Sequence, residues 1–263
     1  SLNCSVIAQQ GAEMQRDHWY TLARDRASLE APSAVGQRAA RRALRQLGSR
    51  QLATRQAPVL FAPELARGLI GHFTAAIRGG ALYRKASFLL GRLGTAVFPA
   101  FVTLREQPHL PKGLASAPFD NEGVATADRD LVSDGVLQGY VLDSYSARRL
   151  GMETTGNAGG IHNLIVEPGP LDHHALLRQM GTGLWVTHLL GHGANLVTGD
   201  YSRGAAGFWV ENGEIAYPVQ QITIAGNLVD IFQHIVAIGN DVDARSGIRC
   251  GSLLVERMTV AGE

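Results

Sequence analysis

The chain has 263 residues, of which 45% are hydrophobic and 18% charged, and this composition is typical of a folded globular protein rather than a disordered one. Its 24 basic and 23 acidic residues nearly cancel, which argues against the positive surface that drives direct nucleic-acid binding. Two cysteines cannot build a disulfide framework, and the sequence shows neither a signal peptide nor a long apolar run. We therefore expect a cytoplasmic protein with no membrane association.

The first part of the chain predicts two strands and a helix, with strands at 2–8 and 17–23 and the helix at 33–47. Ser33 is the expected N-cap of the helix, and Gly48 is expected to stop it. Four arginines, at 38, 41, 42 and 45, are interpreted as a solvated helix face. Because the sequence opens as if within a strand and without Met, we expect residues 1–60 to be the end of a truncated N-terminal α+β region.

The remainder, residues 61–263, predicts a C-terminal α+β domain. Pro63 is suited to the first turn of a helix that runs to about Arg78, and a second helix is expected at 81–93. Strands and helices group separately along the chain, which favours an α+β fold with mixed and antiparallel sheets and helices packed in separate groups. Strands are expected at 58–62, 102–106, 131–137, 140–142, 161–166, 183–191 and 251–260, short helices at 144–150 and after Asp172, and an amphipathic segment at 228–238.

The segment 193–219 is the most informative stretch. Two β-prone runs, 208–210 and 215–217, flank Asn212-Gly213, the pair best suited to a type I′ hairpin turn. Before the hairpin, three glycines surround four polar residues, and we expect a flexible polar loop that lines a cleft. The glycines are Gly199, Gly204 and Gly207, and the polar residues are Asp200, Tyr201, Ser202 and Arg203.

This segment, with the sequence Gly-Asp-Tyr-Ser-Arg-Gly-Ala-Ala-Gly-Phe-Trp-Val-Glu-Asn-Gly-Glu-Ile, resembles the C-terminal region of the TldD/PmbA family, on the PmbA side, also called TldE. The motifs at 156–163 and 239–241 are similar to the same proteins in the same order. PmbA proteins are longer, so the resemblance implies a fragment that lacks the N-terminal portion. It also implies a cytoplasmic peptidase complex in which the TldD partner carries the zinc.

The family resemblance also indicates where zinc ligands would stand. TldD proteins supply a His-Glu-x-x-x-His helix and a distant cysteine, whereas an ungapped comparison places Ala62 and Arg67 at the two histidine positions. Arginine offers no free lone pair to a metal. We expect no cofactor in this chain and zinc in the partner subunit. Cys250 stands where the ligand cysteine would be and is retained only as a weak metal candidate, while Glu64 and His72 on the same helix are interpreted as structural.

Two other catalytic arrangements have weak support. His188 and His192 have the spacing of a zinc-binding pair, but Leu189 replaces the catalytic glutamate and the context is more typical of a strand, so they are weak metal candidates. A self-contained hydrolase built on this pair remains a third hypothesis. Ser202, Asp200 and His162 could form a nucleophilic set only if the fold brought them together, and no Gly-x-Ser-x-Gly elbow is present.

Our first hypothesis is a non-catalytic subunit of a TldD/PmbA-type metallopeptidase complex that acts on unfolded or leader peptides and is inactive without its partner. The expected partners are a TldD-like subunit, an extended peptide and, in the absence of TldD, a second copy of the chain. The alternative is a regulatory protein-binding module without peptidase activity, which matches the family's label as a modulator of DNA gyrase. The expected peptide-cleft residues are His162, Asn163, Asp200, Tyr201, Ser202, Arg203, Asn240 and Asp241.

Overall fold

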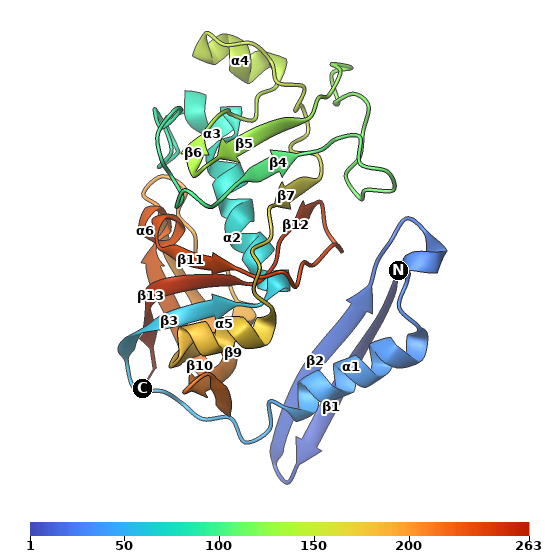
Figure 1. Ribbon diagram of the computed structural model, residues 1–263, viewed down its shortest axis with the longest axis vertical. Helices are drawn as coiled ribbons and strands as arrows, with labels where there is room; N and C mark the ends of the chain where they lie inside the picture. Colours follow the sequence, from blue (N-terminus) through green and yellow to red (C-terminus); the bar gives the residue numbers. More distant parts are fainter. Residues whose placement is uncertain (263) are drawn as a thin grey trace.

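The computed structural model describes residues 1–262, which fold into a small N-terminal unit (residues 1–47) beside a larger C-terminal body (residues 54–262). The N-terminal unit lies against one flank of the body, and the C-terminus lies at the end of the body near the connecting segment (Figure 1). Strands and helices are not alternated regularly, and the sheets are antiparallel or mixed. The predicted α+β class is confirmed.

The N-terminal unit is a hairpin covered by one helix. Strands β1 (Leu2–Gln10) and β2 (Glu13–Thr21) pair antiparallel, and α1 (Pro32–Leu44) packs on the face that carries Trp19. Strand β2 begins and ends earlier than the strand expected at 17–23. Ser33 is not the N-cap, because Pro32 already occupies the first turn and Ala31, which has no capping side chain, precedes it. A one-turn 3₁₀ helix, η1 (Arg26–Ser28), links the hairpin to α1.

The body is built on a six-stranded sheet in the order β10-β9-β8-β3-β13-β11. Strand β10 also pairs with β13, so five of the strands close into a ring and β11 lies outside it at the sheet edge. Residues 55–60, which the sequence analysis assigned to the first region, are part of this sheet. The strands are β3 (Arg55–Phe61), β8 (Gly183–Leu190), β9 (Asp200–Glu211), β10 (Glu214–Asn227), β11 (Ile235–Ile238) and β13 (Leu253–Ala261).

A second, five-stranded sheet has the order β12-β7-β4-β5-β6. Its β5–β6 hairpin turns at Asp134-Gly135, where both residues have positive φ, so the strand expected at 131–137 is divided in two. The strands are β4 (Leu104–Glu106), β5 (Arg129–Ser133), β6 (Val136–Leu137), β7 (Leu164–Val166) and β12 (Ile248–Arg249).

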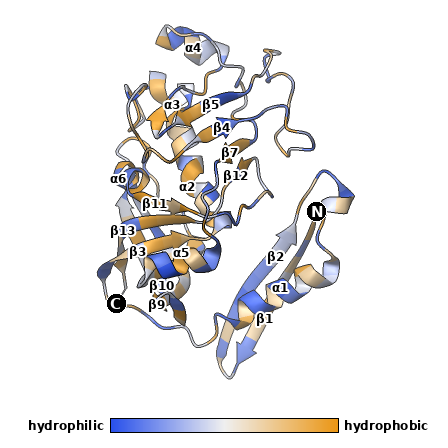
Figure 2. Ribbon diagram, viewed as in Figure 1, coloured by the Kyte–Doolittle hydropathy of each residue, from blue (hydrophilic) through white to orange (hydrophobic). Residues whose placement is uncertain are grey.

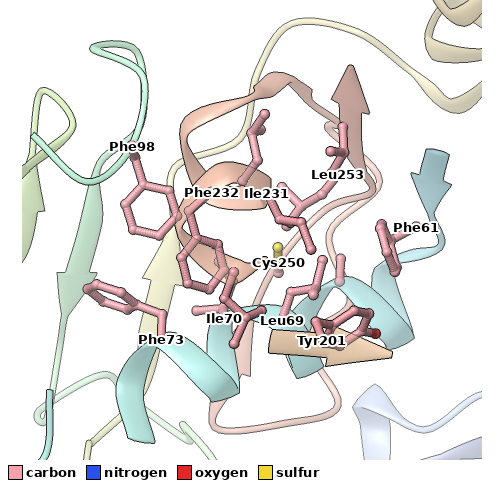
Figure 3. Close-up of a cluster of buried hydrophobic side chains, with 14 of the residues drawn as sticks. Phe61, Leu69, Ile70, Phe73, Phe98, Tyr201, Ile231, Phe232, Cys250 and Leu253 are labelled. Carbon is pink, nitrogen blue, oxygen red and sulfur yellow. The ribbon is translucent and has the colours of Figure 1, made fainter. Parts of the chain in front are cut away.

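Helix α2 (Pro63–Ala76) runs between the two sheets and supplies the centre of the main core (Figures 1 and 3). The Phe73 ring is fully buried and lies 5.1 Å from the Phe98 ring and 6.1 Å from the Phe232 ring. Helix α5 (His173–Met180) covers the opposite face of the six-stranded sheet, where Leu60 packs in a second cluster. The remaining helices are α3 (Gly79–Tyr83), α4 (Ser144–Leu150) and α6 (Leu228–Gln233).

Several predicted elements are wrong or shortened. The helix expected at 81–93 is only the five residues of α3, because Lys85 adopts a φ of 57° and the chain then continues in turns. Segment 140–142 forms no strand, and segment 228–238 divides into α6 and β11. The glycine-rich segment from Asp200 to Gly207 is strand β9 rather than a loop. A Cβ at Gly207 would lie 2.0 Å from the Trp185 carbonyl oxygen, so glycine here permits close strand approach rather than flexibility.

Candidate functional site

Strand β9 divides its four polar residues between two faces. Asp200 and Ser202 are exposed, whereas the alternate residues Tyr201 and Arg203 lie on the face that packs toward α2. The Tyr201 side chain is buried, and its ring is 5.9 Å from the ring of His72 on α2. In Figure 3 the Tyr201 ring lies across α2 beside Leu69, and its hydroxyl points away from Phe232. Of the four expected cleft residues on this strand, two are therefore exposed, Arg203 is partly buried and Tyr201 is buried.

The inner face of β9 carries polar groups without partners. Neither the Tyr201 hydroxyl nor Arg203 Nε has a hydrogen-bond partner among the described residues. Burial raises the pKa of Tyr201 to about 12, although the charge of Arg203 and a weak side-chain interaction in which Arg203 faces the hydroxyl as a donor oppose this rise, and the hydroxyl has no acceptor of its own. Burial first and the Arg203 charge second lower the pKa of His72 below its ordinary value of 6.5. Tyr201 and His72 are therefore neutral, and both lie close to the Arg203 side chain.

His162 and Asn163 are in the five-stranded sheet region and serve a buried network there. The Glu106 carboxylate accepts from the His162 backbone N–H at 2.7 Å and lies 3.3 Å from its ring Nδ1. The Asn163 side chain is fully buried and donates to the Gln107 carbonyl and to Ser116 Oγ. These contacts indicate that both residues hold the loop before β7 in place.

Asn240 and Asp241 follow β11 at the edge of the six-stranded sheet. Asn240 Nδ2 donates to the Pro170 carbonyl at 3.3 Å, and Asp241 accepts from the backbone N–H and hydroxyl of Ser252. Within residues 1–262 no hydrogen bond or ion pair joins this pair to His162, Asn163 or the polar residues of β9. The eight expected cleft residues therefore stand in three separate groups, and the set Ser202, Asp200 and His162 is not assembled.

The face of α2 nearest the N-terminal unit carries Arg67. Its guanidinium is 3.3 Å from the Asp243 carboxylate and donates to the Tyr20 hydroxyl at 2.9 Å. Arg245 also binds Asp243 and lies 3.8 Å from the centre of the Trp19 ring. Two positive charges thus surround one carboxylate at the contact between the N-terminal unit and the body.

His188 and His192 do not form a helical pair. His188 lies in β8, which confirms the strand-like context, and His192 follows in an exposed turn. The His188 Nε2 atom is 3.2 Å from Asp17, a buried carboxylate of β2. His188 is therefore engaged with the N-terminal unit, and no cluster of three metal-ligating side chains occurs in the part of the chain that the structure describes.

The Asp17 cluster is a site that the sequence analysis missed. Asp17 accepts hydrogen bonds from Arg42 at 3.1 Å and Gln46 at 2.8 Å, and Arg42 continues to Glu64 on α2 at 2.6 Å. Arg42 thus bridges the N-terminal unit and the body, rather than forming part of a solvated helix face. The sequence offered one sign of this site, because Asp17 is a carboxylate at an inward-facing position of an alternating strand.

A mainly apolar cavity of about 460 Å³ lies beside the edge strand β11. Val236 of β11 and Phe101 are partly exposed at its wall. The segment 168–171 forms the opposite side and approaches the end of β11, where a Cβ at Gly169 would lie 2.3 Å from the Ile238 carbonyl oxygen.

Comparison with known proteins agrees with this architecture. Residues 54–262 match the PmbA/TldA metallopeptidase C-terminal domain, and residues 1–47 match the central domain of the same proteins. The chain belongs to the PmbA/TldD metallopeptidase family. The two matched ranges coincide with the C-terminal body and the N-terminal unit, with the connecting segment between them.

Individual relatives place the chain near PmbA. It is 54% identical to the metalloprotease PmbA of Escherichia coli O157:H7 over the whole chain, which spans 58% of that relative. It is 26% identical over 69% of its length to a TldD homologue of Haemophilus influenzae, of which it covers 40%. A solved structure from Thermotoga maritima, described as a candidate modulator of a DNA gyrase, matches with a TM-score of 0.92 and 38% identity over 98% of this chain and 61% of that one.

Cys250 stands at the position that the family resemblance gives to a zinc-ligating cysteine, so the state of its thiol matters. Cys250 is fully buried, and its thiol donates to the Gly251 carbonyl at 3.1 Å. Burial, followed by the charges of Asp241 and Asp243, raises the pKa of this thiol well above its ordinary value.

No helix within residues 1–262 has the length and apolar character needed to span a membrane.

Proposed function

We propose that this chain is part of the non-catalytic, zinc-less subunit of a TldD/PmbA-type metallopeptidase complex. The observation that carries the proposal is Arg67, a guanidinium at the position of a zinc-ligating histidine in the family comparison, already paired with Asp243. A guanidinium has no lone pair for a metal and repels a cation. Ala62, at the other histidine position, has no donor atom at all.

The remaining donor does not fit zinc either. Zinc binds the thiolate form of cysteine, and the fully buried Cys250 thiol has a raised pKa, with two carboxylates further opposing ionisation. The positive charges of Arg67 and Arg245 instead balance Asp243, which burial alone would protonate more easily but whose pKa is lowered by Arg245 and Arg67. In this proposal Arg67 of α2 stabilises the contact between the N-terminal unit and the body, and a TldD-like partner supplies the metal.

The contribution of this subunit would be to hold an extended peptide. Strand β11 ends the six-stranded sheet, and an added strand can be held by main-chain hydrogen bonds that accept many sequences. The apolar cavity beside Val236 would take one apolar side chain of that peptide. This arrangement replaces the expected loop cleft at 200–203 as the main contact for the peptide backbone.

The first experiment reconstitutes the complex from full-length proteins. We expect an unstructured peptide to be cleaved by the mixture with a TldD-like subunit, not by either protein alone, and cleavage to be lost with a chelator. Val236→Asp, which places a charge in the cavity, should raise KM, whereas Ile7→Asp, at an exposed residue of β1, should not. Chelator-sensitive cleavage by the full-length protein alone would contradict the proposal.

A metal measurement tests the zinc-less character independently. We expect less than about 0.1 zinc per chain in the purified protein, because structural or catalytic sites bind stoichiometrically. Stoichiometric zinc that disappears in a His188→Ala, His192→Ala double variant, but remains in a His174→Ala control, would establish the hydrolase alternative instead.

The regulatory alternative is favoured by the description of the Thermotoga maritima structure, a candidate modulator of a DNA gyrase. Affinity capture with the full-length protein separates the two. Recovery of a TldD-like protein supports the peptidase subunit, whereas recovery of gyrase without a TldD-like protein supports the regulatory module.

A further inference from the structure

Two hydrogen-bond donors on the inner face of β9 have no acceptor. The Tyr201 residue is only 2% exposed, yet its hydroxyl has no partner, and the neighbouring Arg203 Nε atom is also buried and unpaired. Buried polar atoms are nearly always satisfied by a hydrogen bond. Two such groups on alternate residues of one strand indicate a missing acceptor common to both.

The surrounding chain does not supply that acceptor. Within residues 1–262 Arg203 makes no ion pair, and the nearest acidic residue in sequence, Asp200, faces the other side of β9, where it accepts from Thr198 at 2.6 Å and Asn227 at 3.4 Å. The third polar group on the inner side is His72, whose edge meets the Tyr201 ring. The local field is therefore positive without a counter-charge.

We infer that Tyr201 and Arg203 form a binding site for a carboxylate group of a peptide. A guanidinium and a phenol can each donate to one carboxylate oxygen, and hydrogen bonds to a charged acceptor are the strong ones. The ligand chemistry is that of a free peptide C-terminus or of an aspartate or glutamate side chain. The choice of a peptide as the source rests on the proposed function, whereas the anion site itself rests on the unpaired donors.

Of the two side chains, Arg203 is the one that reaches solvent, because Tyr201 is buried. Arg203 is only partly buried, and its side chain passes close to Gly193, where a Cβ would lie 3.1 Å from Arg203 Cγ. Exposed Leu190 and Val197 border the same turn, with Leu190 packed over Gly204. A carboxylate bound at Arg203 would thus have apolar side chains beside it, which suits a residue at a peptide end.

Binding of three fluorescent peptides to the full-length protein tests the inference. All share one unstructured sequence without acidic residues: one has a free C-terminus, one is amidated, and one is amidated with a single glutamate. We expect the amidated neutral peptide to bind about tenfold more weakly than at least one of the other two. Arg203→Gln should abolish that difference, and Arg26→Gln, at an exposed arginine without side-chain contacts, should preserve it.

Tyr201→Phe distinguishes a binding role from a structural one. Because the hydroxyl has no partner in the fold, this variant should keep or raise Tm while it weakens carboxylate binding severalfold. The two acidic arms identify the source of the carboxylate. Equal affinity for all three peptides, or identical behaviour of Arg203→Gln and Arg26→Gln, would show that water satisfies these donors and would overturn the inference.

A peptide-free measurement separates this inference from the proposed function. Acetate is titrated into the full-length protein while the His72 ring resonance is followed by NMR. We expect a saturable shift in the wild type and in Arg26→Gln, and none in Arg203→Gln. If acetate binds but no peptide does, the carboxylate site stands and the peptide-holding function fails. If peptides bind but neither acetate nor a peptide carboxylate has an effect, the peptide-holding function stands and the carboxylate site fails.

Discussion

The N-terminal unit and the C-terminal body are stabilised in different ways. The core of the body is continuous around α2, whereas the buried cluster of the N-terminal unit joins Trp19, Val35 and Ala39, and its other buried hydrophobic residues are the alanines Ala8 and Ala43. Figure 2 shows the same contrast, with β3 and β13 largely hydrophobic and the N-terminal unit mixed. Among the described residues, the apolar core of the N-terminal unit is therefore much smaller than that of the body.

Those contacts are mainly polar and aromatic. Asp17 joins Arg42 of its own unit to His188 of the body, and Arg245 of the body stacks on Trp19. A buried ion pair adds little net stability over apolar packing, but it is costly to break and strict in geometry. Apolar burial thus folds the body, whereas a polar network fixes the orientation of the N-terminal unit on it.

The largest expected effect is in the body. Phe73→Ala removes the ring that packs between Phe98 and Phe232 and should lower the free energy of unfolding by about 4 kcal/mol. Phe101→Ala, at a half-exposed ring, should cost less than about 1 kcal/mol. Chemical denaturation of the full-length protein measures both, and equal losses would refute the assignment of the core.

Asp17→Asn should act on the N-terminal unit alone. Removal of the charge leaves Arg42 without its buried partner, and we expect a local loss of about 3 kcal/mol. Hydrogen exchange followed by mass spectrometry should show faster exchange in residues 1–47 and unchanged exchange in α2. Asp128→Asn, at an exposed carboxylate, is the control, and a uniform increase across both regions would disprove the separation.

Acid should also separate the two regions. Burial opposes ionisation of Asp17, but the hydrogen bond from His188 and the charge of Arg42 outweigh it and lower the pKa below the ordinary 3.8. The stabilisation is then complete well above pH 3.8 and is lost as the pH falls through the lowered folded pKa. Exchange in residues 1–47 should rise below about pH 4 in the wild type, and Asp17→Asn should show much less of this acid response.

The smallest effects concern helix caps. The Asp172 side chain accepts from the Ala175 N–H at the start of α5, so Asp172→Ala should cost about 1 kcal/mol. Ser33 caps nothing in α1, and Ser33→Ala should change stability by less than about 0.5 kcal/mol. Thermal unfolding compares them, and a larger loss for Ser33→Ala would restore the predicted cap.

Local signals in the sequence were reliable where a few neighbouring residues decide the geometry. Asn212 and Gly213 both adopt positive φ, as a type I′ turn requires, and the two strands pair directly on either side. Pro63 opens α2, and Gly151 ends α4 in the left-handed conformation. The helix expected at 81–93 failed because tertiary contacts, such as Ser87 Oγ to the Ala76 carbonyl, hold that segment in turns.

The candidate site was less predictable than the fold. The sequence identified Tyr201 and Arg203 as noteworthy but read their glycine-rich surroundings as a loop. Glycine has two uses, backbone freedom and close approach, and only the neighbouring strand shows which one applies. The partners of Asp17 could not be recognised from the sequence, because Arg42 lies 25 residues further along the chain and His188 lies in a distant strand of the body.

The sequence by itself determined the family, the α+β class and the turns, because these depend on composition, residue order and local backbone preference. It also determined that Ala62 and Arg67 cannot bind zinc, since this follows from the chemistry of two side chains. Only the tertiary structure decided that Arg67 pairs with Asp243, that Asp17 links two units, and that Tyr201 and Arg203 lack an acceptor. These properties depend on distances between residues remote in the chain, which long-range packing sets.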